Sequence, residues 1–197
     1  MVSGKKPQKE EWGLVLDYLP YGSPEDNRPV YQKKPLVQAV GDSHFVLMEL
    51  MLKNDIVPMT QDRVYIGEGD RDVIDHVKRR ITYDELTHGS QMELPFILEK
   101  IILENESKYI DFFNDAYPIT NRLHMLELLP GIGKKLMWAI IDEHKKGKFL
   151  NFNNLVERVK GLHTPEKLIV HRIIDELMDE NIKYRLFTTP AKNRHHK

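Results

Sequence analysis

The chain contains no cysteine in its 197 residues, which excludes disulfide bonds and thiolate chemistry. A protein without disulfides suits the reducing environment of the cytoplasm. No apolar run reaches the roughly 18 residues that a membrane-spanning helix needs. Residues 1–9 also lack the apolar segment of a signal peptide. We therefore expect a cytoplasmic protein that has no membrane partner.

The sequence also lacks the motifs of common enzyme classes: it has no P-loop, no Gly-x-Ser-x-Gly turn and no dinucleotide fingerprint. Its nine histidines are scattered, without the His-x-x-x-His spacing of a zinc site. Asp70, Asp72 and Asp75 form one acidic cluster, whose spacing fits a capped helix start as well as a metal site. These absences predict a protein that is not an enzyme and that holds no metal and no cofactor.

Charge is nearly balanced over the whole chain but divided between its two parts. The formal net charge of −1 combines 14 Lys+Arg and 21 Asp+Glu in residues 1–119 with 15 Lys+Arg and 9 Asp+Glu in residues 120–197. A basic second part favours binding to a polyanion, although cations after Tyr184 account for most of its excess. The acidic first part is left free for a protein partner.

The first 80 residues predict a small barrel. They begin with a polar, lysine-rich segment, residues 1–10, that we expect to be disordered. Apolar runs separated by turn residues then predict short strands, with residues 45–52 open to either a strand or a short helix; the runs are 12–19, 36–40, 45–52, 56–58 and 63–66. Closely spaced short strands are typical of an OB-like barrel.

Aromatic residues in this part have two interpretations. On an exposed barrel face they would stack on nucleic-acid bases, but aromatics in short strands are more often core residues. The residues concerned are Trp12, Tyr18, Tyr21, Tyr31 and Tyr65.

The pattern of apolar residues changes to a helical period after the predicted strands. Val73, Ile74 and Val77 share one face of a helix expected over residues 72–80. The three cations at 78–80 would then suit the negative end of the helix dipole. The spacing therefore favours a helix that leads out of the barrel.

Residues 81–117 are expected to form a helical connector. Thr82 and Glu85 have the spacing of a capping box, which predicts the start of a short helix. Gly89-Ser90 should end it, and a longer apolar-faced helix follows over residues 93–114.

The remaining sequence predicts four helices joined by two glycine turns, over residues 120–128, 134–145, 151–159 and 166–177. Asn151 is a suitable N-cap, and Pro165 stands where a first-turn proline is tolerated. The turns, at 129–133 and 159–163, follow the same plan, so the second hairpin is a blurred copy of the first.

The first turn has the composition of a phosphate site. Leu129-Pro130-Gly131-Ile132-Gly133 is followed by Lys134 and Lys135 at the start of a helix. Glycines let the backbone approach a ligand closely, and a helix start presents unpaired N–H groups at the positive end of the dipole. Two lysines are misplaced at that end, and a bound anion would relieve the conflict.

Residues 123–177 resemble a tandem helix-hairpin-helix domain, found in many DNA-repair, recombination and DNA-uptake proteins. The resemblance is carried by residues 129–135 and by Val159-Lys160-Gly161-Leu162. It implies that main-chain amides and nearby lysines bind backbone phosphates. The residues implicated are Gly131, Ile132, Gly133, Lys134, Lys135, Lys160, Gly161 and Lys167.

Some helix-hairpin-helix proteins also bind a monovalent cation through carbonyls of the hairpin. The resemblance would place such a cation on the carbonyls of Leu129 and Ile132, although nothing in this sequence requires it. Two residues depart from the pattern. Met137 replaces a usual alanine, which suggests a different packing of the two helices, and His163 replaces the second glycine of the second turn. Trp138 is interpreted as a core or domain-packing residue rather than a stacking platform.

The expected architecture is α+β, with an OB-like barrel domain at 1–80, the connector at 81–117, a tandem helix-hairpin-helix domain at 118–185 and a basic tail at 186–197. The chain as a whole resembles an uncharacterised family of archaeal proteins presumed to bind nucleic acid. We expect non-catalytic, sequence-independent binding of the DNA or RNA backbone. The alternatives are a protein-interaction scaffold and a metal-dependent nuclease that uses the acidic cluster at 70–75.

Overall fold

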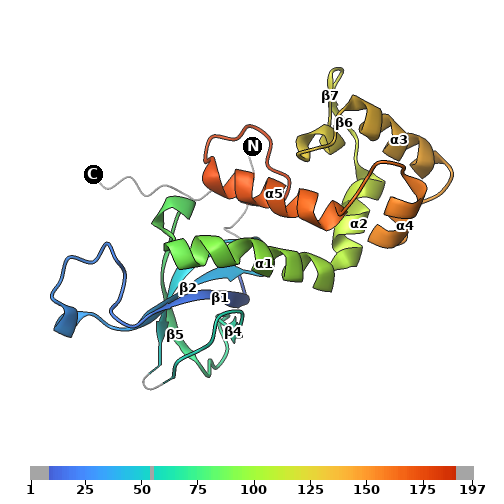
Figure 1. Ribbon diagram of the computed structural model, residues 1–197. Helices are drawn as coiled ribbons and strands as arrows, with labels where there is room; N and C mark the ends of the chain where they lie inside the picture. Colours follow the sequence, from blue (N-terminus) through green and yellow to red (C-terminus); the bar gives the residue numbers. More distant parts are fainter. Residues whose placement is uncertain (1–8, 54–55, 190–197) are drawn as a thin grey trace, which may run out of the picture. The chain divides into compact units, whose positions relative to one another are not determined.

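The computed structural model describes residues 9–53 and 56–189 (Figure 1). Within it the chain forms two compact units, each described by itself below. Of the described residues, unit 1 comprises 9–53, 56–97 and 176–189, and unit 2 comprises Leu98–Asp175. These units are groups of residues in mutual contact and do not test the domain boundaries expected from the sequence. Those boundaries stay a prediction.

The fold is α+β, with a five-stranded antiparallel sheet curled into a half-barrel and five α-helices in the described part of the chain. The strands of this sheet are β1 (Trp12–Leu19), β2 (Leu36–Gly41), β3 (Leu47–Leu52), β4 (Arg63–Tyr65) and β5 (Ile74–Arg80). The α-helices are α1 (His88–Glu104), α2 (Glu106–Asp115), α3 (Lys134–Lys145), α4 (Phe152–Arg158) and α5 (Pro165–Met178). A second, two-stranded sheet consists of β6 (Pro118–Thr120) and β7 (Leu123–His124), and short 3₁₀ helices are η1 (Val30–Gln32), η2 (Tyr83–Glu85) and η3 (Met125–Leu128).

The half-barrel has the strand order β4-β1-β2-β3-β5, so β4 and β5 are its two edges. Register shifts interrupt the β1–β2 and β3–β5 pairings, and such irregularities bend a strand and increase its twist. Every residue of β2 is buried, which shows that both faces of the central strand are covered. One face holds the apolar core of Val15, Val37, Ala39, Met48, Leu50, Val64, Ile66 and Ile74.

Helix α1 meets the sheet through a buried polar contact. Thr87 Oγ1 accepts the amide of Ser90 at 3.0 Å, which caps the start of the helix. The Ser90 hydroxyl then donates to Gln38 Oε1 on β2 at 2.7 Å. This differs from the sequence prediction of a break at Gly89-Ser90, because Thr87 begins the helix before the glycine. Pro95 consequently lies inside α1 rather than in its first turn.

Residues 74–80 form strand β5 and not the expected helix. The spacing of the apolar residues fits a helix, but pairing with β3 decides the local structure. Lys78 and Arg79 therefore do not lie at a helix end: both reach the fully buried carboxylate of Glu49, at 3.0 Å each. A buried charge needs such partners, so the pairing of Lys78 and Arg79 with Glu49 favours a strand over a helix at residues 74–80.

Several other elements predicted from the sequence also differ from the structure. The helix expected over 120–128 is instead the β6–β7 hairpin followed by η3, which His124 caps through Nδ1. The helix expected over 93–114 is divided into α1 and α2, and residues 56–58 do not form a strand. Glu10, expected in the disordered start, is buried and accepts the amides of Ser43, His44 and Val46.

The capping predictions are confirmed. The Thr82–Glu85 capping box is formed at η2, Asn151 caps α4, and Pro165 is the first residue of α5. Helix α3 has the predicted bounds. Residues 1–8, most of the expected disordered start, and 190–197, most of the expected basic tail, lie outside the described residues.

Candidate nucleic-acid interface

The two glycine turns of unit 2 have nearly the same backbone geometry. Gly131 has φ +91° and Gly161 has φ +92°, a conformation that side chains with a Cβ rarely adopt. The amide of Ile132 donates to the carbonyl of Leu129 at 3.1 Å, and the amide of Leu162 donates to that of Val159 at 3.2 Å. The repetition seen in the sequence is therefore also a repetition of structure.

Apolar side chains fix each turn to the core. Leu129 and Ile132 are buried in the first turn, as are Val159 and Leu162 in the second. Ile132 can therefore serve a ligand only through its main chain. The Leu129 carbonyl already accepts an amide, and the cation site considered from the resemblance stays a prediction.

Helix α3 begins without a capping side chain. Gly133 is its N-cap, and no side chain makes a cap hydrogen bond there. A Cβ built on Gly133 would have no heavy atom within 4 Å, so the space in front of the helix is open. The first-turn amides of a helix have no partners within the helix. They are therefore presented, with the positive end of the dipole, to an accessible space.

A hollow of about 300 Å³ joins the two turns in front of α3. Gly133, Lys135 and Leu136 line it from the first turn, and Lys160 and Gly161 line it from the second, together with Ala139. We call it the turn hollow. Residues 21 to 28 positions apart thus share one space.

Lys134 differs from its neighbour. Its ammonium pairs with Glu127 at 3.2 Å and donates to the carbonyl of Arg122 at 3.3 Å. The amide of His124 and the ammonium of Lys134 hold the pKa of the Glu127 carboxyl below its usual range. The electrostatic conflict predicted at Lys134 is therefore relieved by the protein's own carboxylate, and Lys134 does not line the turn hollow.

The second turn contributes less than the first. Its helix α5 begins with Pro165, which has no amide hydrogen, after Thr164 at φ +44°. Lys167 is exposed in the first turn of α5, outside the lining of the turn hollow. Of the three residues predicted here, the structure brings Lys160 and Gly161 to the first turn and leaves Lys167 apart.

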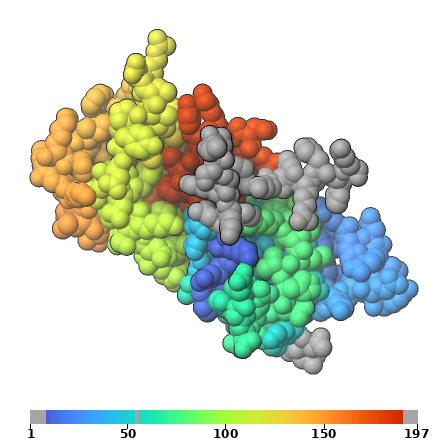
Figure 2. All heavy atoms as spheres, turned by 180° about the vertical axis from the view of Figure 1, so that it is seen from behind, coloured from blue at the N-terminus to red at the C-terminus, as the bar shows by residue number. Residues whose placement is uncertain are grey.

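A second hollow of unit 2, of about 700 Å³, lies between α2, the β6–β7 hairpin and α3. We call it the hairpin hollow. The hairpin projects from the unit as a narrow finger, in yellow in Figure 2. Trp138 lines this hollow and is 55% exposed. Of the two roles expected for it, that of a core residue is therefore wrong, and domain packing stays a prediction. Met137, in contrast, is buried in the core.

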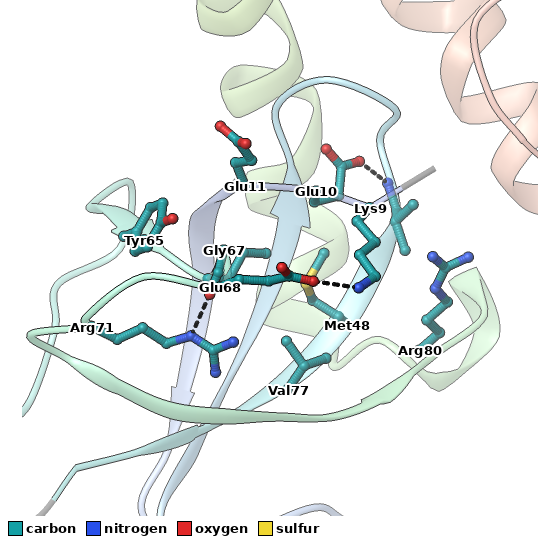
Figure 3. A pocket seen from close by; sticks show the side chains of 12 residues that line it. Lys9, Glu10, Glu11, Met48, Tyr65, Gly67, Glu68, Arg71, Val77 and Arg80 are labelled. Carbon is teal, nitrogen blue, oxygen red and sulfur yellow. Dashed lines mark hydrogen bonds and ion pairs between the residues drawn. The ribbon is translucent and has the colours of Figure 1, made fainter. Parts of the chain in front are cut away.

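A third hollow, of about 440 Å³, belongs to unit 1 and lies at the open side of the half-barrel (Figure 3). Its charges are mixed: Lys9 pairs with Glu68 at 2.6 Å, and Arg71 donates to the carbonyl of Gly67 at 2.9 Å. Its lining has three cations and three carboxylates, namely Lys9, Arg71, Arg80, Glu10, Glu11 and Glu68. Because the two signs are balanced, this hollow has no net positive field that would attract a polyanion.

The aromatic residues of unit 1 are divided in their surroundings. Trp12 meets Tyr65 edge-on at 5.1 Å between ring centroids, and the Arg63 guanidinium lies 4.5 Å from the Trp12 ring. Tyr21 and Tyr31 are 69% and 83% exposed. The half-buried pair is part of the packing, while the two exposed tyrosines belong to the long loop between β1 and β2.

Asp70, Asp72 and Asp75 do not form a metal-binding group. In the described part of the chain no three His, Asp or Glu residues come together in a way that could hold a metal ion. The carboxylate of Asp75 instead lies 2.6 Å from Nδ1 of the adjacent His76. The cluster on which the nuclease interpretation depended is therefore a feature of the sequence alone.

The model of the family described as "Protein of unknown function (DUF655)" matches residues 9–189. The chain belongs to this family. It is 45% identical over 184 residues to the uncharacterised protein MJ0038 of Methanocaldococcus jannaschii, covering 92% of this chain and 82% of that one. The crystal structure of Af1531 from Archaeoglobus fulgidus, a DUF655 member, is similar with a TM-score of 0.86. Its identity is 50%, over 91% of this chain and all of that one.

Membership of DUF655 confirms the resemblance to an uncharacterised archaeal family, and its relatives bring no activity with them. No α-helix among the described residues has both the length and the apolar composition needed to cross a bilayer. The function must therefore be argued from the geometry of this DUF655 chain.

Proposed function

We propose that this DUF655 protein binds the backbone of DNA or RNA without sequence preference, through the turn hollow. In this proposal unit 2 works as a tandem helix-hairpin-helix module and the half-barrel of unit 1 as an OB-like domain. The observation that carries the proposal is the meeting of the capless start of α3 with Lys135 and Lys160 in one accessible hollow.

The chemistry of the turn hollow suits a phosphate diester. Amides and ammonium groups donate hydrogen bonds to phosphate oxygens, and the helix dipole favours the negative charge. Neither donor reads a base, so contacts of this kind position a protein on a strand without specifying sequence. Two cations imply weak, salt-sensitive binding, because affinity depends on counterions released from the phosphates.

The test is a fluorescence-anisotropy titration of labelled duplex and single-stranded oligonucleotides at several salt concentrations. Lys135→Glu with Lys160→Glu should abolish binding at moderate salt. For the milder pair of Lys→Gln changes at the same positions, the slope of log affinity against log salt on duplex DNA should fall by about 1.8. Lys100→Glu with Lys148→Glu changes the net charge equally at exposed positions outside the turn hollow and should retain binding.

Equal retention of oligonucleotide by the wild type and the Lys135/Lys160 variant would overturn the proposal. A wild type that binds no nucleic acid at low salt would also overturn it, and would leave the protein-interaction scaffold as the better hypothesis. Loss of binding in both double variants would show that net charge alone, and not the turn hollow, controls affinity.

A further inference from the structure

The hairpin hollow has the features of a binding site that the backbone-binding proposal does not use. Its walls are mostly apolar, from Leu123, Met137 and Ile140 among others, and its rim carries Asn121 and Arg122 at the turn of the β6–β7 hairpin. Ligand sites commonly combine apolar walls with a few polar groups in a volume of about this size. The indole of Trp138 is more than half exposed here, a large apolar surface for a protein to leave in water.

The two hollows of unit 2 are both lined by residues of the first turns of α3. Lys135 lines the turn hollow, whereas Lys134 and Trp138 line the hairpin hollow. Lys134 and Trp138 are four residues apart, so they lie on one helix face about 6 Å apart along the axis. That distance is on the scale of one or two nucleotide steps. A strand with a phosphate at the start of α3 therefore has its next bases within reach of Trp138.

We propose that the hairpin hollow takes an unpaired nucleobase stacked on Trp138, while the neighbouring phosphate lies at the start of α3. This inference rests on the proposed function and deepens it, because it makes single-stranded nucleic acid, or an unpaired segment, the favoured ligand. Every base has a flat apolar face that stacks on an aromatic side chain, so the contact needs no sequence preference. Bases within a duplex are stacked on each other and cannot present that face.

The charges around the hairpin hollow agree with a nucleotide as occupant. Arg122 and Lys134 are cations of its lining, and the one carboxylate among the lining residues, Glu127, is paired with Lys134. A protein segment docked by its apolar side chains would need no phosphate site beside it. Lys134, the first residue of α3, lines this hollow, and this closeness to the start of the helix favours a nucleic-acid strand over a protein partner.

The chain offers a direct test, since Trp12 and Trp138 are its two tryptophans. In a Trp12→Phe background, emission reports on Trp138 alone. Oligo(dT) of twelve nucleotides should quench this emission on binding, and a duplex closed at both ends by non-nucleotide linkers should leave it nearly unchanged. In the otherwise native chain, Trp138→Leu should weaken binding of oligo(dT) about 5- to 150-fold, the range expected for one stacked base. Trp138→Phe, which keeps an aromatic face, should recover most of this loss.

Three results would overturn the inference while leaving the proposed function intact: salt-sensitive binding of oligo(dT) without a change in Trp138 emission, equal quenching by the closed duplex, or an unchanged oligo(dT) affinity in Trp138→Leu. Absence of binding to both probes would overturn the proposed function and the inference together. The emission change is measured on protein with Trp138 intact, so it tests the inference even where Trp138→Leu alters folding.

Discussion

Replacing Arg79 by methionine should destabilise the half-barrel by about 3 kcal/mol at neutral pH. Glu49 is fully buried in β3, and its carboxylate accepts hydrogen bonds from Arg79 Nε at 3.0 Å, Arg79 Nη2 at 3.1 Å and Lys78 Nζ at 3.0 Å. Removing one partner of a buried ion pair costs about 3–5 kcal/mol. The lower end applies here, because the Arg79 side chain is 33% exposed and Lys78 remains.

The loss should depend on pH in a defined direction. Burial raises the pKa of Glu49, but hydrogen bonds from Arg79, Lys78 and Ser23 outweigh it, so the pKa lies below its ordinary value. A carboxyl with a depressed pKa contributes stability above the pKa of the unfolded chain, about 4.3, and loses it as the pH falls through the folded value. The difference between wild type and Arg79→Met should therefore be full at pH 7 and shrink below pH 4.

Urea unfolding followed by Trp12 emission in a Trp138→Phe background measures this effect in unit 1. Lys78→Met is the matched control, since it removes one hydrogen bond from the same carboxylate and leaves the two from Arg79; its cost should be smaller. A difference between wild type and Arg79→Met below about 0.5 kcal/mol at pH 7 would refute the reasoning. A difference of the same size at pH 3 and pH 7 would do so as well, since it would show that the Glu49 charge is not involved.

Three further predictions concern unit 2 and the C-terminal segment. Gly131→Ala should lower the free energy of unfolding by about 1–2 kcal/mol, because Gly131 has a positive φ. Gly133→Ala, with open space for its Cβ, should lower it by less than about 1 kcal/mol but should weaken oligonucleotide binding. Urea unfolding measures the first effect and fluorescence anisotropy the second. Lys134→Ala should leave duplex affinity within about twofold, because Glu127 already holds its ammonium, and Lys135→Ala should reduce it more, as anisotropy at low salt would show. Glu176→Leu should speed hydrogen exchange at the amides of 186–188, which its buried carboxylate accepts at 2.6–3.1 Å; unchanged exchange would contradict this role.

The parts of the fold that could be predicted are those with strong local signals. Local signals mark the start of each of three helices: a glycine turn precedes α3, the side chain of Asn151 caps α4, and Pro165, with its fixed φ, begins α5. The strands β1 and β2 have β-branched or aromatic runs with turn residues on either side. Neighbouring residues are enough to fix these elements.

The elements that could not be predicted depend on residues far away in the sequence. Val73, Ile74 and Val77 suit a helix, and only the buried carboxylate of Glu49, about thirty residues earlier, requires cations on an adjacent strand. The helix predicted over 120–128 depends on the spacing of Leu123, Leu126 and Leu128, of which Leu123 lies in the β6–β7 hairpin and the other two in η3. In both cases pairing between strands outweighs a local preference of a few tenths of a kcal/mol per residue.

The sequence did not predict how the candidate residues divide in space: four of the eight line the turn hollow, namely Gly133, Lys135, Lys160 and Gly161. Successive residues of a helix point about 100° apart, so Lys134 and Lys135 do not face the same phosphate, and they line different hollows. The same geometry places Trp138 with Lys134 and away from the core. The positive character of the turn hollow therefore depends on Lys135 and Lys160, which come from different hairpins. A phosphate site of this construction exists only while unit 2 is folded, because neither hairpin alone brings two ammonium groups to the turn hollow.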